Sequence, residues 1–395
     1  MKNGSLFLPA LLIILCIACN HRDTKPGDPY SSEDGPMTIA LDPDMPESPR
    51  IREIIDTVIY IPLETTPGAT VGEVSKVIFR GKRIYIGDFE STESIYCFTA
   101  EGKFLFSIQN KGKGPGEYVS LNDFDVEEKS GRIFVHDSYT KAILIYDSKG
   151  QFIRKHVVRH IFTTFNLAGG RNAIAYAEYI PNPTLPGNPA SNIFIFNYET
   201  GEIIDSFLPF DENLQLHMKI RGQINYTSYT REVSYIHDYF TNSIYSFENN
   251  SLSRRWIIDF GGKSIPKDFW KEGSPRTEME EISDGRFCSG IANYQVAGNH
   301  IIGCYSYKNS VYMFIFDSRD QSVISIKNAV IQREQVFPVI LAPPFHTDGE
   351  NIVSVIEPAW FARLFELSTP GIFLPAGFEG LDIYSNPVLQ IIKLK

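Results

Sequence analysis

The chain has 395 residues, of which 43% are hydrophobic and 21% charged, so we expect a packed core in one large domain or two smaller ones. Its formal net charge of −10, without any basic block, argues against nucleic-acid binding, because phosphate contacts need clustered Lys and Arg. The 20 Tyr and 28 Phe favour strands and indicate an all-β fold.

Residues 1–18 have the pattern of a signal peptide, since Lys2 is followed by LFLPALLIILCIA (6–18), an apolar run that is short for a membrane span. The run ends at Cys19 and resembles a bacterial lipoprotein signal, in which that cysteine is lipidated. Cys16 stands where such signals usually have Leu, and an ordinary cleaved signal peptide is the alternative. We predict a lipid anchor on Cys19 in the cell envelope, expected in the outer membrane, with the membrane face left open.

The segment after the cysteine is polar and rich in Pro, Gly, Ser and Asp. Such a composition cannot bury a core, so we predict a flexible tether over 19–36. The remaining residues, 37–395, are predicted to form one domain.

A pattern of turn, apolar strand, Asp, polar turn, strand and glycine-containing turn recurs through this domain. It is clearest at 81–108 and 130–156, where Asp88 and Asp137 are separated by 49 positions. Further copies, complete or partial, lie at 192–207, 233–247, 305–326 and 348–357. A period near 50 residues with three or four short strands per unit predicts a β-propeller. We predict six blades of about four antiparallel strands, with five or seven as alternatives.

The two ends of the domain predict how the ring closes. A strand at 56–64 lies before the first full repeat, and another at 386–395 lies after the last. One blade built from both would remove the open edge of the ring, so we expect the terminal strands to pair. Residues 262–281 lengthen one repeat and are interpreted as an insertion.

The loop GKGPGEY (112–118) has three glycines in five residues and looks at first like a phosphate-binding loop. The Walker and dinucleotide patterns, however, need G-x-x-x-x-G-K-[ST] or G-x-G-x-x-G at the start of a helix. Here the spacing is G-x-G-x-G, Pro115 interrupts it and a strand, 121–126, follows. We therefore interpret the loop as the connection from the rim of one blade to the centre of the next, in which glycine permits unusual backbone angles.

Residues 112–126 and the copy at 132–156 resemble an NHL-type propeller repeat, whose pattern runs approximately G-x-G-P-G-x-aromatic into the inner strand. The chain from 38 to 395 also resembles the six-bladed β-propeller lipoproteins of gut-type Gram-negative anaerobes. The segments that carry this second resemblance are 61–66, 112–118, 256–261, 348–358 and 386–395. The resemblance implies the fold and the anchor, but hardly any activity, because the function of most of that family is unknown.

Three aspartates, Asp88, Asp137 and Asp238, share one repeat position at the end of a strand, where Asp commonly bonds turn amides. We interpret them as structural. His136 and His237 precede two of them and could suggest a metal site between blades. Neither has ligand spacing such as H-x-x-x-H, so we interpret them as exposed turn residues and predict no metal site.

Glu117 and Tyr118 follow the glycines and could face the end of the central channel, where Glu357 would arrive from the last blade. Carboxylates there could do acid–base chemistry or hold Ca²⁺. The ligands of calcium-dependent propeller lactonases do not map onto this chain residue by residue, and Tyr118 resembles the packed aromatic of the NHL-type repeat. Together with His136 and His237, these three are the candidate ligand-binding residues of the channel mouth, and no residue is predicted to be catalytic.

The cysteines of the domain, Cys97, Cys288 and Cys304, match no zinc pattern. We predict buried thiols, with a Cys288–Cys304 disulfide as the alternative.

These features predict a lipid-anchored, monomeric propeller that binds an unknown ligand, for which glycans and peptides are the candidates. No resident cofactor and no nucleic-acid partner are expected, and the lipid is the expected contact with the membrane. The alternative is an enzyme at the channel mouth, such as a metal-dependent hydrolase, lactonase or lyase. Three or more converging carboxylate or imidazole groups would favour the enzyme, and a neutral or aromatic-lined mouth would favour the binder.

Replacing the predicted lipidation site tests the anchor. Cys19→Ala removes the thiol that would carry the lipid, so the variant should leave the membrane fraction and lose acyl labelling. A variant that still fractionates with membranes and labels normally would show that the cysteine carries no lipid.

Overall fold

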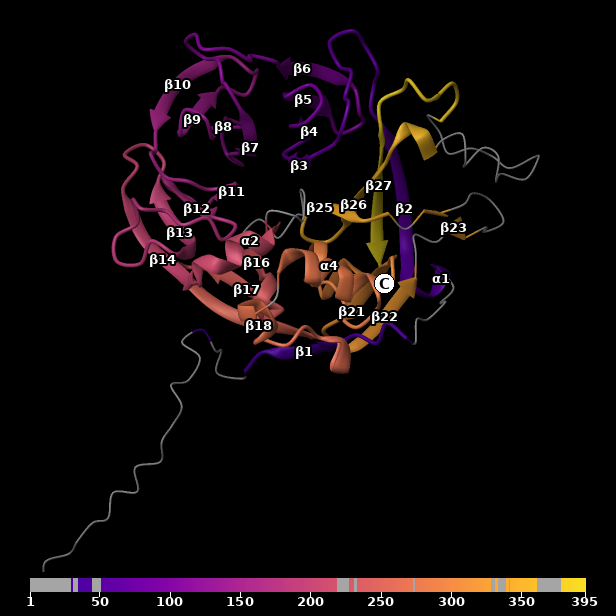
Figure 1. Ribbon diagram of the computed structural model, residues 1–395. Helices are drawn as coiled ribbons and strands as arrows, with labels where there is room; N and C mark the ends of the chain where they lie inside the picture. The colour runs from indigo at the N-terminus through magenta and orange to yellow at the C-terminus, as the bar shows by residue number, and fades with distance from the viewer. Residues whose placement is uncertain are drawn as a thin grey trace, which may run out of the picture.

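The computed structural model describes residues 30, 35–44, 51–218, 227–230, 233–272, 274–327, 331–332, 339–340, 342–360 and 378–395. They form six sheets of four or five strands arranged round one axis, which is the predicted six-bladed β-propeller (Figure 1). Cys19 and the predicted signal peptide lie outside the described residues. None of the helices in the described part is long and apolar enough to cross a membrane.

The first three blades each use four consecutive strands, ordered from the axis outwards. Blade 1 contains β3 (Lys76–Arg80), β4 (Arg83–Asp88), β5 (Ser94–Thr99) and β6 (Phe104–Ile108). Blade 2 contains β7 (Leu121–Val126), β8 (Ile133–Asp137), β9 (Ala142–Tyr146) and β10 (Phe152–Val157). Blade 3 contains β11 (Thr164–Leu167), β12 (Asn172–Tyr176), β13 (Ser191–Asn197) and β14 (Ile203–Pro209).

The other three blades include the ends of the domain. Blade 4 contains β15 (Thr227–Tyr229), β16 (Ser234–Asp238), β17 (Ser243–Glu248) and β18 (Ser251–Asp259), with β1 (Met37–Ala40) added in parallel at its rim. Blade 5 contains β19 (Ala292–Ala297), β20 (His300–Tyr307), β21 (Ser310–Asp317) and β22 (Ser322–Lys327). Blade 6 contains β25 (Pro344–Thr347), β26 (Ile352–Ile356), β27 (Val388–Leu394) and β2 (Ile55–Pro62).

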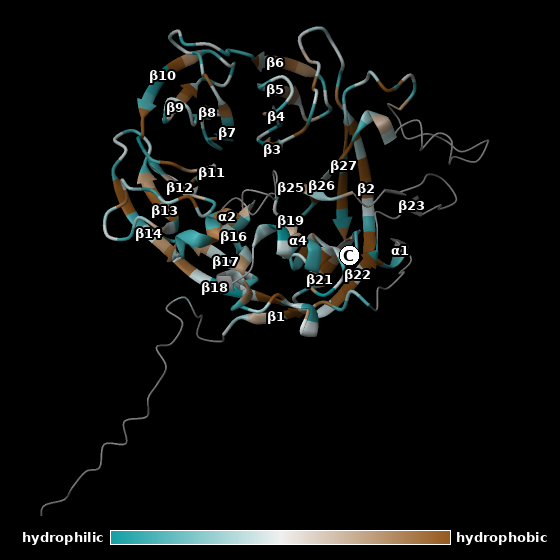
Figure 2. Ribbon diagram, viewed as in Figure 1, coloured by the Kyte–Doolittle hydropathy of each residue, from teal (hydrophilic) through white to brown (hydrophobic). Residues whose placement is uncertain are grey.

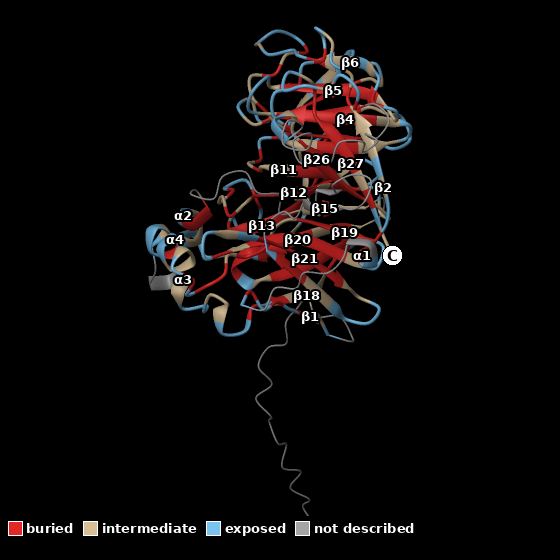
Figure 3. Cartoon of the chain, turned by 90° about the vertical axis from the view of Figure 1, so that its right-hand side faces the viewer, coloured by how far each residue is buried: buried red, intermediate tan, exposed pale blue. Residues whose placement is uncertain are grey.

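The middle strands of the blades are apolar on both faces. All five residues of β9 are buried. Hydrophobic residues are frequent in the strands of the ring, and most residues of the middle strands are buried (Figures 2 and 3). Each blade presses one face on the blade before it and the other on the blade after it, so neither face of a middle strand meets water. The high content of Phe, Tyr, Ile and Val supplies these six interfaces.

Both ends of the chain close the ring, as predicted. β27 pairs with β26 on one side and with β2 on the other, and β2 forms the rim of blade 6 (Figure 1). The N-terminal strand is therefore the outermost strand of a blade whose other strands come from the C-terminal part of the chain.

Side chains link neighbouring inner strands in a closed circuit round the axis, which we call the axial polar ring. Its bonds join Lys76 Nζ to Asp123 (2.8 Å), the Phe165 amide to Asp123 (2.8 Å), Tyr229 Oη to the Leu167 carbonyl (3.2 Å), the Val296 amide to Ser228 Oγ (3.0 Å), Gln295 Nε2 to the Phe345 carbonyl (3.2 Å), and the Phe79 amide to His346 Nε2 (3.2 Å). An inner strand turns one edge toward the axis, where no further strand can pair with it. The ring satisfies backbone groups on these edges and ties each blade to the next.

The N-terminal segment docks earlier than the predicted boundary at residue 37. Tyr30, within the predicted tether, accepts hydrogen bonds from the Leu208 amide in blade 3 (3.2 Å) and from the Arg254 amide in blade 4 (2.7 Å). Asp44 then accepts a bond from Tyr307 (3.1 Å) and one from Lys308 (3.3 Å) in blade 5. The described residues of this segment therefore contact blades 3, 4 and 5, although they precede β2 in the chain.

The insertion between blades 4 and 5 is helical. It contains η3 (Gly261–Lys263), α3 (Phe269–Glu272) and α4 (Pro275–Ser283), and α4 begins after an N-cap at Ser274, whose hydroxyl accepts the Thr277 amide. The remaining short elements are α1 (Ile51–Ile54), η1 (Glu212–Leu214), α2 (Gln215–Met218), η2 (Tyr239–Thr241), β23 (Ile331–Gln332) and β24 (Val339–Ile340).

The three cysteines of the domain are buried free thiols, so the alternative of a Cys288–Cys304 disulfide is wrong. Burial raises the pKa of the Cys97 thiol to about 11 and that of Cys288 and Cys304 to about 12.

The histidines expected in exposed turns are core residues. His136 is 1% exposed and His237 is fully buried, each within a strand. The ring of His136 stacks on Phe162 with 3.9 Å between centroids and meets Phe165 edge-on. Within the described part of the chain neither of its nitrogens has a hydrogen-bond partner, and burial lowers its pKa to about 3.

Removing the last strand tests ring closure. Deleting residues 386–395 removes β27, which pairs with both β2 and β26, and takes away three side chains that are 0–4% exposed, those of Val388, Leu389 and Ile392. At about 1.5–3 kcal/mol for each buried aliphatic side chain, the loss approaches the stability of a whole domain. We expect aggregated or protease-sensitive protein. A chain starting at residue 30 instead of 20 is the control and should melt like the longer form, whereas a cooperative melt of the 1–385 protein would contradict closure.

Replacing His136 tests its burial in the neutral form. The unfolded chain binds a proton at this residue below about pH 6.5 and the folded chain only near pH 3, so stability is complete above pH 6.5 and falls as the pH drops. Between pH 7 and pH 5, the free energy of unfolding should fall by about 2 kcal/mol less in His136→Phe than in wild type, measured by denaturant unfolding. His160→Phe is the control, because His160 bonds Thr184 and the Gly201 carbonyl and its loss should destabilise the fold at both pH values. An unchanged pH dependence in His136→Phe would contradict this account.

Candidate functional site

The candidate residues predicted from the sequence and the large cavity of the structure lie at opposite ends of the propeller. Glu117 and Tyr118 precede the inner strand β7, and Glu357 follows β26, so these candidates lie at the end of the ring where the inner strands begin. His136 is near the same end, as the penultimate residue of β8, whose last residue, Asp137, pairs with the first residue of β7. A large cavity lies at the opposite end, where β3, β7, β11 and β15 finish.

Glu117 and Tyr118 hold the glycine loop in shape. The Glu117 carboxylate accepts the Gly114 amide at 2.7 Å, and a Cβ atom on Gly112 would lie 2.0 Å from that carboxylate. The left-handed backbone of the loop is at Gly116, with φ of +78°, and not at Gly114. Tyr118 is fully buried and its hydroxyl donates to the Glu93 carbonyl at 2.5 Å. The loop is therefore held by the carboxylate of its own Glu117 and by the buried ring of its own Tyr118, in agreement with the architectural interpretation.

Two of the three repeated aspartates bind turn amides, as predicted, whereas Asp238 accepts bonds from the hydroxyls of Tyr179 and Thr241. Asp88 accepts the amides of Gly72, Glu73 and Ser91, and Asp137 accepts those of Val119, Ser120 and Thr140. Each carboxylate thus joins the loop entering its blade to a turn within the blade. Nearby, burial and the charges of Glu73 and Asp88 raise the pKa of Glu357.

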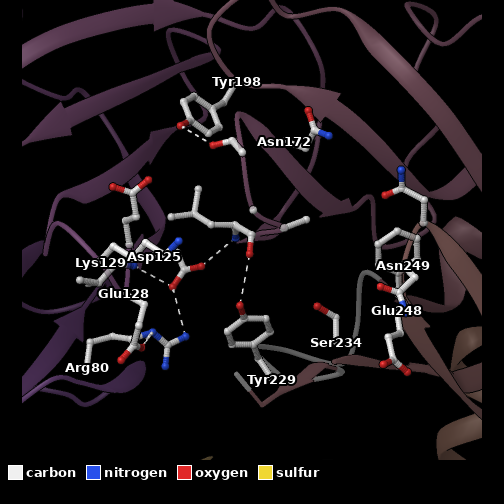
Figure 4. Close-up of a pocket in the computed structure, with 18 residues that line it drawn as sticks. Arg80, Asp125, Glu128, Lys129, Asn172, Tyr198, Tyr229, Ser234, Glu248 and Asn249 are labelled. Carbon is white, nitrogen blue, oxygen red and sulfur yellow. Dashed lines mark hydrogen bonds and ion pairs between the residues drawn. The ribbon is translucent and has the colours of Figure 1, made fainter. Parts of the chain in front are cut away.

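The cavity has a volume of about 1030 Å³ and lies between blades 2, 3 and 4, with Arg80 of blade 1 at its border (Figure 4). Its walls are three hairpin turns, at 127–132, 168–171 and 249–250. The lining residues are 80, 125–129, 167–170, 172, 198, 229, 234 and 247–250. None of the five residues proposed from the sequence is among them.

The floor of the cavity is joined to the axial polar ring. Asp125 accepts the Leu167 amide at 2.8 Å, and the Leu167 carbonyl accepts Tyr229 Oη. The Arg80 guanidinium lies 3.5 Å from Glu128, 3.9 Å from Asp125 and 5.0 Å from the centre of the Tyr229 ring. Burial, with the charge of Asp125, raises the pKa of Tyr229. These groups hold one another in place, so the floor is built before any ligand arrives.

The walls carry exposed polar groups. Glu128 and Lys129 lie on one side of the cavity, and Glu248 and Asn249 lie on the other (Figure 4). Asn249 and Asn250 have φ of 51° and 60°, a conformation that Asn tolerates and that a two-residue hairpin turn requires. Across the described residues there is no group of three or more His, Cys, Asp or Glu that could hold a metal ion.

Sequence reasoning missed this cavity because its walls look like ordinary turns. The motifs EEKSG (127–131) and ENN (248–250) carry only the signal of a hairpin connection. Their place in the repeat, after an inner strand or between the third and fourth strands, would have put them at one end of the ring. Which blades leave space between these turns follows only from the packed structure.

The fold has relatives among solved structures. The chain is similar to a predicted exported protein from Bacteroides fragilis, with a TM-score of 0.69 and 14% identity over 91% of this chain and 99% of that one. It is also similar to a member of the DUF4221 family from Bacteroides vulgatus, with a TM-score of 0.49 and 12% identity over 87% and 98% of the two chains. At 14% identity the likeness to the Bacteroides fragilis protein shows the fold alone. No curated protein matches the chain by sequence.

A family model matches residues 37–393, from the first residue of β1 to the penultimate residue of β27. The match spans all six blades and takes in the cavity at the ends of the inner strands. The chain therefore belongs to the family described as a domain of unknown function, DUF4934.

Proposed function

We propose that this protein is a lipid-anchored binding module of the cell envelope that holds an oligosaccharide in the cavity between blades 2, 3 and 4. The observation that carries the proposal is the cavity itself. Its volume of about 1030 Å³ is at the upper end of the range for sites that bind small molecules. The floor is fixed by hydrogen bonds, and the walls present side chains from three separate turns.

The chemistry of the lining fits a ligand rich in hydroxyl groups. Amides at Asn172, Asn249 and Asn250 offer both donors and acceptors, and the carboxylate of Glu248 adds acceptors. A sugar hydroxyl donates and accepts at once, so paired amides and carboxylates match it well. A peptide would need apolar pockets for anchor side chains, and the apolar residues here, such as Phe247 and Val126, are already buried in the blades.

The cellular location is part of the proposal. The signal pattern of residues 1–18 and the cysteine that follows support export and lipidation. The structural similarity to an exported Bacteroides protein supports an envelope or secreted location.

The alternative of a channel-mouth enzyme finds less support. Four carboxylates line the cavity, which by number alone would favour catalysis. Asp125 and Glu128, however, share Arg80, and Glu127 is bonded to Arg132 at 2.9 Å. Carboxylates that balance fixed cations serve to shape a floor and are poor general bases.

Binding to an array of oligosaccharides of varied composition, followed by calorimetry, tests the proposal. Asn249→Gly removes a wall amide and keeps the left-handed turn, so affinity for the bound saccharide should fall about fivefold, the value of one hydrogen bond. Asn309→Gly is the matched control, because Asn309 occupies a similar left-handed turn between β20 and β21 at the other end of the ring. Binding of peptides with no saccharide bound, or an equal effect of the two variants, would contradict the proposal.

A further inference from the structure

We propose that the cavity discriminates by charge, accepting neutral oligosaccharides and rejecting acidic ones such as uronates and sulfated sugars, and that Glu248 is the residue that sets this preference. The inference rests on the proposed function and adds the chemical class of the saccharide. The observation behind it is the distribution of fixed charges over the lining.

Among the described residues that line the cavity, acidic groups outnumber basic ones. The charged lining residues are Arg80, Asp125, Glu127, Glu128, Lys129 and Glu248, which are four carboxylates and two cations. An anionic ligand would need a cation free to receive it, ideally an arginine with its planar face of donors exposed.

The arginine of the cavity is already occupied. The Arg80 side chain is 9% exposed, lies near two carboxylates and donates to its neighbouring carbonyl at Phe79 (3.0 Å). The central carbon of its guanidinium lies over the Tyr229 ring, 5.0 Å from the ring centre. A ligand carboxylate or sulfate could reach it only by displacing Glu128, which is itself an anion on the cavity wall.

The second cation, Lys129, lies among carboxylates. It directly follows Glu127 and Glu128 in the same turn, and it is exposed to solvent. Glu127 is balanced by Arg132, at 2.9 Å, and Glu128 by Arg80. Arg80 is shared by Glu128 and Asp125. Burial opposes the ionisation of Glu127, but bonds and charges that include the charge of Lys129 lower its pKa. Three cations on this side therefore face three carboxylates, and the wall has no net positive charge to attract an anion.

Glu248 has no such balance. It is the last residue of β17, is exposed, and lies on the wall opposite Glu128 and Lys129 (Figure 4). Among the described residues its carboxylate takes part in no ion pair, although the nearby charge of Arg255 acts together with its own on the Tyr235 hydroxyl. Its charge therefore acts on whatever occupies the cavity, repelling a uronate and leaving a neutral hydroxyl free to donate to it.

The test compares each neutral oligosaccharide of the array with the same oligosaccharide oxidised at C6 to the uronate. The readout is the ratio of the Kd of the uronate to the Kd of the neutral form. Wild-type protein should bind the neutral form at least fivefold more tightly, and the ratio should shrink as NaCl is raised. Glu248→Gln should lower the ratio about fivefold, and Glu248→Lys should invert it. Glu350→Gln is the matched control, because Glu350 is an exposed turn carboxylate outside the cavity, and its ratio should equal that of wild type.

Equal or tighter binding of the oxidised form by wild-type protein would overturn the inference and leave the proposed function standing. The same holds if Glu248→Gln keeps the wild-type ratio. Absence of binding to any saccharide would overturn the proposed function and this inference together.

Discussion

The structure depends on how the inner strands deal with the edge that each turns toward the axis. Backbone groups on such an edge have no further strand to pair with, and leaving them unpaired inside the molecule would be costly. The axial polar ring supplies partners from side chains of the adjacent blades. Asp123 shows what this arrangement costs, because burial raises its pKa while the Lys76 ammonium at 2.8 Å opposes the shift. A blade can therefore be fixed in position only together with its neighbours.

The same bonds explain why the candidate site has a rigid floor and variable walls. Tyr229 and the Leu167 carbonyl belong both to the axial polar ring and to the cavity, so the bonds that fix the core also fix the floor. The side chains that face the ligand stand on hairpin turns, where substitutions leave the blades intact. Propellers of one fold can in this way serve different ligands while keeping one scaffold.

Much of the fold followed from the sequence, because a repeat of about 50 residues and apolar strands are local signals. The terminal strands paired as expected, and Asp88 and Asp137 bound turn amides as expected. His136 was misjudged because its place beside a turn was given more weight than the apolar strand IFVHD that contains it. The cavity was missed because the space between its turns depends on how three blades pack. The sequences at 127–129 and 248–250 do not indicate how far apart these turns lie.

Docking of Tyr30 in the seam between blades 3 and 4 limits how far the protein can reach. With the proposed lipid on Cys19, Tyr30 is eleven positions further along the chain, and at about 3.3–3.6 Å per position the chain between them spans at most about 40 Å. The docked end of the propeller would then lie within about 40 Å of the lipid surface. Molecules embedded in the same membrane would then meet the propeller at a high effective concentration. A soluble polymer would have to come within this distance of the membrane surface before it could bind.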